Sequence, residues 1–174
     1  MVPRNVAKKF LHIFMIPPTL VLDTNICLDL FVFRDPRWAA LMAALEQGSV
    51  RAITRSDCRA EWLAVLNYPK LKLDSEAQAA CATRFDALIA CKDKPEVEPA
   101  RPTLPKCSDG DDQKFLELAF DEKADVLISK DKALLKLAKR NVKHGLFPIL
   151  SPEAWHQNEE RSFAGISAQI PTAP

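Results

Sequence analysis

Short apolar segments alternate with helical segments along most of this chain, and this alternation limits the folds that the chain can adopt. The first apolar segment, Thr19–Leu22, ends at Asp23, as expected of a buried strand. Further strands are predicted at residues 50–54, 125–129 and 146–150. Strands that alternate with helices pair in parallel through right-handed crossovers. We therefore expect an α/β fold, a three-layer α/β/α sandwich with a central parallel sheet.

Capping residues mark several of the predicted helices. Asp35 and Pro36 are typical of a helix start, and Gly48 is typical of the position after its end. Ser75 and Gln78 fit a capping box at the start of another helix. The predicted helices span residues 35–47, 56–66, 75–91, 111–121 and 131–140, with a short one after Ser151.

The proline-rich residues 92–106 are expected to form an extended connection with a short edge strand. Neither flank of this connection contains enough elements to fold alone. We therefore expect one domain over residues 18–157. Residues 1–17 are predicted to be an extension outside the core, and residues 158–174 a flexible tail.

The composition excludes several classes of function. The four glycines are too far apart for a dinucleotide fingerprint, a phosphate-binding P-loop or a nucleophile elbow. The three histidines and five cysteines form no zinc-binding pattern. A formal net charge of +1 creates no overall attraction to nucleic acid, and no apolar stretch reaches the roughly 18 residues of a membrane helix. Scattered, odd-numbered cysteines indicate reduced thiols, so we expect a cytoplasmic protein without a membrane partner.

Four segments place acidic side chains where a parallel sheet gathers its ligands: VLDTN at 21–25, RAEW at 59–62, SDGDDQKF at 108–115 and ISKD at 128–131. Asp23 and Asp131 follow predicted strands, and ligands of such sheets bind outside the carboxyl ends of the strands. Glu61 falls early in a helix. Asp112 falls in a first helical turn, with Asp111 beside it.

Clustered carboxylates point to metal chemistry. Carboxylates within about 4 to 6 Å of one another must share protons or hold cations. Oxygen ligands without histidine or thiolate favour Mg²⁺ or Mn²⁺, and such ions support attack of water on a phosphodiester. Structural roles compete with this interpretation, since Asp131 also fits a helix cap and Glu61 an exposed helix position. Structural roles are expected for the remaining aspartates that lie near helix or strand ends: Asp35, Asp57, Asp74, Asp121 and Asp125.

Together and in this order, the four segments resemble those of the PIN-domain ribonucleases, and more narrowly the VapC-like toxins of bacterial toxin-antitoxin systems. The resemblance runs from about Leu20 to Trp155. It implies a PIN-like fold in which four acids are both catalytic residues and metal ligands: Asp23, Glu61, Asp112 and Asp131. It also implies a further metal ligand and a set of supporting residues: Asp111, and then Thr24, Asn25, Ser129 and Asp109.

The resemblance further implies Mg²⁺- or Mn²⁺-dependent endonucleolytic cleavage of RNA by metal-activated water, a homodimer, and a cognate antitoxin protein. RNA binding requires cations near the acids, because phosphates dominate affinity. Basic residues close to the motifs are candidates for this role: Arg34, Arg59, Lys114 and Lys130, with Arg37, Arg55 and Lys132 as further ones. Trp38, Trp62 and Trp155 lie on amphipathic helices, which favours a core role over stacking on bases.

The chain departs from the family pattern at four positions. Lys130 stands where glycine is frequent, and Gly110 where proline is frequent. Gln113 and Ala133 stand where a further acid is frequent. The loss of an acid at position 133 weakens the case for a second metal ion.

Three other functions compete with this interpretation, and the sequence disfavours the first two. A haloacid-dehalogenase-like phosphatase requires a second acid two residues after the first, where this chain has Asn25. A receiver-like phosphoacceptor requires its acidic pair early in the chain, whereas Asp111 and Asp112 come late. The third alternative is a non-catalytic PIN-like module that binds RNA or protein and uses its acids for structure.

Overall fold

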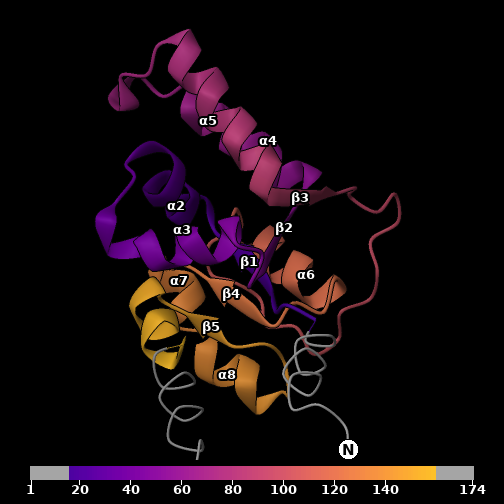
Figure 1. Cartoon of the computed structure of the whole chain (residues 1–174). Coiled ribbons are helices and arrows are strands. Elements are labelled where there is room, and N and C mark those ends of the chain that lie inside the picture. Colours follow the sequence, from indigo (N-terminus) through magenta and orange to yellow (C-terminus); the bar gives the residue numbers. More distant parts are fainter. Residues whose placement is uncertain (1–15, 160–174) are drawn as a thin grey trace, which may run out of the picture.

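A parallel sheet forms the centre of the molecule, whose computed structural model describes residues 16–159 (Figure 1). Within those residues the sheet has five strands: β1 (Thr19–Leu22), β2 (Arg51–Arg55), β3 (Ile89–Lys92), β4 (Val126–Ile128) and β5 (Ile149–Leu150). Their order across the sheet is β3-β2-β1-β4-β5, and every neighbouring pair is parallel. The predicted α/β sandwich is confirmed.

Helices connect the strands: α2 (Thr24–Cys27), α3 (Ala39–Glu46), α4 (Ser56–Leu66), α5 (Ser75–Leu88), α6 (Gln113–Asp121), α7 (Lys132–Leu135) and α8 (Ala138–Lys143). Residues 152–159 are also helical. Three shorter turns complete the description: the π-helix η1 (Leu28–Val32), and the 3₁₀ turns η2 (Pro36–Trp38) and η3 (Pro69–Leu71).

The register of the sheet brings the ends of β1 and β4 together. Leu22 lies opposite Ile128, and the Asp23 N–H donates to the Ile128 carbonyl at 3.0 Å. The residues that follow both strands therefore emerge side by side at one edge of the sheet. Since β1 is central, with β2 on its other side, this edge is also close to the start of α4.

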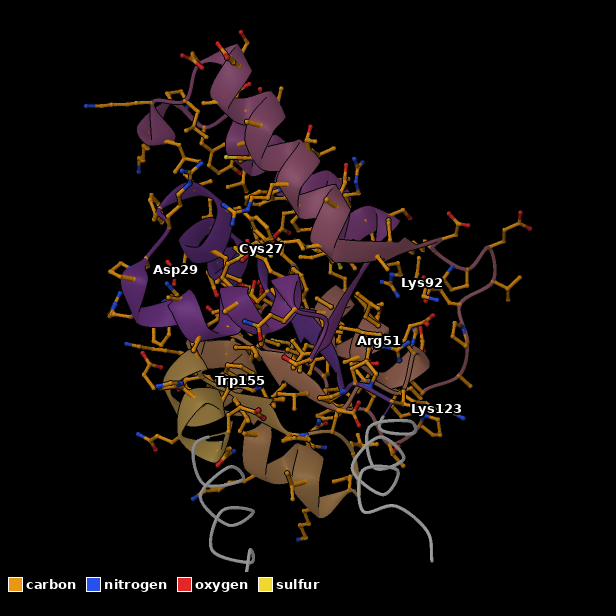
Figure 2. The ribbon with its side chains drawn as sticks, in the orientation of Figure 1. Cys27, Asp29, Arg51, Lys92, Lys123 and Trp155 are labelled. Atoms are coloured by element: carbon orange, nitrogen blue, oxygen red, sulfur yellow. The ribbon has the colours of Figure 1, made fainter. Side chains whose placement is uncertain are left out.

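Two apolar clusters, one on each face, cover the sheet. Successive strand residues point to opposite faces, so Leu20 and Leu22 join one cluster and Val21 joins the other. The first cluster packs against η1, α3, α4 and α5, and includes Trp155 from the last helix, labelled in Figure 2. The second packs against α6 and α7. This two-sided burial is what makes the architecture three-layered. The three tryptophans are buried, as expected from their helices.

The edge strand β3 corrects the prediction for residues 75–91. The helix ends at Leu88, and Ile89–Lys92 pair with β2 instead of continuing the helix. Ala52 lies opposite Ile89, whose side chain is buried, while the next three residues are exposed. Pairing with β2 therefore overrides the local helical pattern. The edge strand predicted within residues 92–106 is therefore misplaced, because β3 reaches only Lys92 and residues 93–106 form no strand.

Three helix boundaries also differ from the predictions. The cap of α5 is Asp74, whose Oδ1 accepts from the Ala77 N–H at 2.8 Å, rather than Ser75. Helix α6 begins at Gln113, two residues later than expected. The predicted helix 131–140 is two helices, because a turn between them lets α7 and α8 both pack against β5. By contrast, the expected Asp35 cap and the left-handed Gly48 after α3 are confirmed.

The other aspartates assigned structural roles are engaged as expected. Asp125 accepts from the Thr19 N–H at 2.7 Å, and Asp57 accepts from the Cys58 N–H at 2.9 Å. Asp121 pairs with Arg101 through two hydrogen bonds of 2.7 and 2.5 Å. In the part of the chain that the structure describes, no helix is long and apolar enough to cross a membrane. Residues 1–15 and 160–174 lie outside the description, and the predictions of an extension and a flexible tail fall almost wholly on them.

A buried arginine joins α4 and α6. Arg55, at the end of β2, is 2% exposed and donates to both Asp57 oxygens at 2.8 Å and to Glu117 at 3.2 Å. Burial raises the pKa of Asp57, but the hydrogen bonds and charge of Arg55 outweigh it and lower that pKa to about 2. Arg55 is thus an internal ion-pair partner, so it is not accessible to RNA.

Replacing this arginine is expected to destabilise the fold. Arg55→Met removes the cation that Asp57 and Glu117 share and leaves them only their longer pairs, Lys94–Asp57 at 3.7 Å and Arg101–Glu117 at 3.9 Å. Breaking a buried pair costs about 3 to 5 kcal/mol. Chemical denaturation of the two proteins measures the difference. Arg84→Met is the matched control, because the Arg84–Glu46 pair is exposed and such pairs contribute about 1 kcal/mol or less. Equal losses in the two variants would contradict the role assigned to Arg55.

Candidate active site

Asp23 is the most buried acid of the predicted site, with 3% of its surface exposed. It follows β1 directly, and its Oδ2 accepts from the Asn25 side-chain amide at 2.7 Å and from the Ser129 hydroxyl at 2.5 Å. Burial raises the pKa of Asp23, while the Ser129 bond works in the opposite direction and the nearby charge of Glu61 raises it further. A buried carboxylate held in one orientation is suited to bind a cation.

The residues expected to support Asp23 connect β1 to the segment after β4. Asn25 Oδ1 accepts from the Lys130 N–H at 3.2 Å, and Ser129 Oγ accepts from the Asp131 N–H at 2.9 Å. Asn25 and Ser129 therefore fix the position of Asp131 relative to Asp23. The structure brings these predicted partners together, although 106 residues separate Asp23 from Ser129.

Asp112 lies at the start of α6, and the charges of the other acids act on it. Burial, followed by the charges of Asp23, Asp131 and Asp109, raises the pKa of Asp112 to about 7. A hydrogen bond with Asp131 has the same effect. Asp112 occupies the N-cap position of α6, but its side chain forms no capping hydrogen bond. Helix capping therefore does not explain this acid.

Asp131 combines a structural contact with its place in the acidic group. Its Oδ1 caps α7 by accepting from the Ala133 N–H at 2.6 Å and the Leu134 N–H at 3.3 Å. The predicted cap is thus confirmed, and it also fixes the carboxylate beside Asp112. We refer below to Asp23, Asp112 and Asp131 as the three-acid group.

Glu61 lies in α4 and is engaged on both oxygens. Its Oε1 accepts from the Thr24 hydroxyl at 2.6 Å, and its Oε2 contacts the Lys114 ammonium of α6. Burial lowers the pKa of Lys114, but its hydrogen bond and ion pair with Glu61 outweigh this and raise it. Glu61 is therefore near the three-acid group but neutralised by a lysine.

Asp109 and Asp111 lie at the rim of the site, and both are exposed. Asp109 Oδ1 accepts from the Asp111 N–H at 3.0 Å, which shapes the turn before α6. The charge of Asp109 contributes to the raised pKa of Asp112. The Asp111 carbonyl accepts from Lys114 at 2.6 Å, so its observed contact is through the backbone rather than the carboxylate.

The donor set fits a hard divalent cation chemically. The three-acid group offers only carboxylate oxygens, and burial with mutual repulsion raises the pKa of Asp23 and Asp112, which a bound cation would counteract. Among residues 16–159, no three histidine, cysteine, aspartate or glutamate side chains form a ready-made metal-binding group. Mg²⁺ or Mn²⁺ would be held by Asp23, Asp112 and Asp131, with Glu61 reachable only after it parts from Lys114.

Most of the residues proposed to bind RNA contact acids of the protein itself. Arg59 donates to both Asp86 oxygens at 2.7 and 2.5 Å, and Lys130 contacts Asp29 at 2.5 Å. Arg34 is exposed, with a left-handed backbone at φ 48°. Of the four candidates, Lys114 is the one whose side chain contacts a predicted catalytic acid, Glu61.

Asp29 is a site neighbour that the motifs do not single out. It lies in η1, shortly after Cys27 (Figure 2), is buried, and accepts from the Trp38 indole at 3.1 Å as well as from Lys130. Since the Lys130 backbone holds Asn25, Asp29 helps to fix the support of Asp23. The signal in the sequence is a single acid within the apolar run ICLDLFVF, where an unpaired charge would be costly.

The fold and these contacts define a parallel α/β protein with an acidic centre at the carboxyl edge of its sheet. A family model described as a PIN domain matches residues 19–133, from β1 into α7. The chain belongs to the PIN domain family, whose members are in general nucleases. A comparison with curated proteins gives no significant match.

Proposed function

We propose that this protein is a metal-dependent endoribonuclease and the toxin of a toxin-antitoxin pair. The observation that carries the proposal is the three-acid group, in which Asp23 and Asp131 raise the pKa of Asp112 at the edge where β1 and β4 end. Membership of a nuclease family and the order of the four acidic segments support it. The proposed catalytic unit is the domain of residues 18–157.

The described contacts hold two of the acids in place for the proposed reaction. A bound Mg²⁺ or Mn²⁺ would stabilise charge on the phosphate and activate the attacking water. Asn25 and Ser129 keep Asp23 in one orientation, and the cap of α7 does the same for Asp131. Asp112 and Asp131 are only half-buried, so a phosphodiester can approach them from solvent.

The biological setting rests on the resemblance to VapC-like toxins. It includes an RNA substrate, a homodimer, a cytoplasmic location and inhibition by a cognate antitoxin. The alternative is a PIN-like module that binds RNA or protein without cleaving it. The half-buried carboxylates of Asp112 and Asp131 favour the enzyme. Carboxylates repel the phosphates of RNA unless a cation lies between them.

Circular single-stranded RNA tests the endonuclease proposal. An endonuclease opens the circle with Mg²⁺ or Mn²⁺, whereas an exonuclease or a binding module leaves it closed. Controlled expression in bacteria tests the toxin proposal: the wild type is expected to stop growth, and Asp23→Asn is expected not to. Cleavage of the circular RNA without growth arrest would support the nuclease proposal and contradict the toxin proposal. Intact circles with folded, metal-supplied protein would reject the endonuclease.

A further inference from the structure

Lys114 is held between the acids of the site more firmly than a surface lysine. Its ammonium contacts Glu61 Oε2 and donates to the Asp111 carbonyl at 2.6 Å. Its side chain is 19% exposed, and its ammonium lies 5.3 Å from the centre of the Phe115 ring. These contacts restrict the rotamers of the lysine side chain. The positive charge of Lys114 is therefore held at a defined position.

Glu61 has no free carboxylate oxygen with which to hold a metal ion. Glu61 Oε1 is engaged by Thr24, and its Oε2 by Lys114. Positions 113 and 133 carry no acid: Gln113 Oε1 accepts from the Cys107 N–H at 2.7 Å, and position 133 is an alanine. A divalent ion beside Glu61 would therefore face a fixed ammonium of like charge.

The three-acid group is in the opposite situation. Its carboxylates act on one another, and the described contacts of Asp23 and Asp131 are with neutral donors. Lys114 lies two residues after Asp112, in the first turn of α6, where backbone N–H groups and the helix dipole also favour an anion. A phosphate held by an ion on the three-acid group would thus come within reach of the Lys114 ammonium.

We propose that Lys114 is a catalytic residue that contacts the scissile phosphate in place of a second divalent ion, so that the centre works with one ion per chain. This inference rests on the proposed nuclease function. On binding RNA, the ammonium exchanges part of its contact with Glu61 and Asp111 for a phosphate oxygen. Its charge stabilises the charge that develops on the phosphate, so it acts on kcat more than on KM.

Counting bound ions and measuring cleavage in the full chain test this inference together. Electron paramagnetic resonance during a Mn²⁺ titration is expected to show one bound ion in the wild type and to retain that ion in Lys114→Met. Lys114→Met is expected to lower kcat for single-stranded RNA about 100-fold, the effect of removing one charge-stabilising donor. Lys114→Arg, which keeps the charge, is expected to recover part of that loss.

Lys139→Met is the matched control, since Lys139 is exposed on α8, and it should cleave and bind Mn²⁺ like the wild type. Circular dichroism establishes that each variant is folded. Two ions per wild-type chain, or undiminished kcat in Lys114→Met, would overturn the role of Lys114 while leaving the nuclease intact. A wild type that neither binds Mn²⁺ nor cleaves RNA would overturn the proposed function and this inference with it.

Discussion

Asp112→Asn is expected to lower the rate of RNA cleavage about 100- to 1000-fold, while making the metal-free protein more stable. The rate falls because the amide removes the charge of one of the three acids that would hold the cation, and single charge-stabilising groups contribute about 100- to 1000-fold. The stability rises because burial and the charges of Asp23 and Asp131 disfavour the Asp112 carboxylate. Initial rates on labelled RNA and chemical denaturation measure the two effects.

The raised pKa of Asp112 also predicts how the stability of the metal-free protein changes with pH. The pKa of Asp112 is about 7 in the folded protein against 3.8 for the free side chain, so the folded state binds the extra proton. The metal-free wild type should therefore lose stability as the pH rises from about 4 to 7, by about 1 kcal/mol or more after screening. Asp112→Asn should lack this loss.

Asp93→Asn is a suitable control, because Asp93 is an exposed acid in the proline-rich connection. It should change neither the cleavage rate nor the stability. If Asp112→Asn cleaves RNA as fast as the wild type, Asp112 does not belong to the catalytic centre. If it is less stable than the wild type at pH 8, the mutual repulsion of the acids is not the dominant force at this position.

Trp62→Ala is expected to lower the free energy of unfolding by about 3 to 5 kcal/mol. Trp62 is 1% exposed and stacks on Phe85 with ring centres 5.2 Å apart, and Phe31 lies 6.0 Å away. These rings join α4 to α5, the pair that extends beyond the sheet at the top of Figure 1, and to η1. Alanine leaves a large cavity between them. Thermal and chemical denaturation measure the loss.

Trp62→Phe separates the loss of volume from the loss of the indole N–H. The Trp62 Nε1 has no hydrogen-bond partner. Phenylalanine therefore reduces the side-chain volume without removing a hydrogen bond. It should therefore cost clearly less than alanine. Because Glu61 precedes Trp62 on α4, cleavage should also fall in Trp62→Ala when the helix loosens. Normal stability in Trp62→Ala, with RNA binding lost, would instead indicate that Trp62 stacks on bases.

The sequence predicts the strands of this fold well where the apolar signal is strong. Residues 19–22 form an apolar, β-branched run followed by Asp23, and residues 126–128 form an apolar run between Asp125 and Ser129; β1 and β4 lie there. Strand β3 has only one buried side chain, Ile89, so its pattern resembles the end of the preceding helix. Only pairing with β2 makes it a strand. The helical segment 24–32 is likewise hard to predict, because its apolar residues have no clear period.

In the candidate site, too, the sequence predicts the features that depend on local patterns and misses those that depend on distant partners. Asp23 and Asp131 can be identified from the sequence because each follows a strand, and parallel strands bring such residues to one edge. The ion pairs Lys114–Glu61 and Lys130–Asp29 join residues 53 and 101 positions apart. No local pattern encodes these partners. The Lys114–Glu61 pair is, however, what neutralises Glu61 beside the three-acid group.

The most direct test of the central claim is cleavage of labelled single-stranded RNA by the purified chain with Mg²⁺, with Mn²⁺, or with EDTA. The three-acid group predicts cleavage that requires the divalent ion, stops with EDTA and returns when the ion is restored. Cleavage that continues unchanged in EDTA would contradict a metal-dependent centre at Asp23, Asp112 and Asp131. So would a folded protein that binds the ion but leaves every RNA of a varied panel intact.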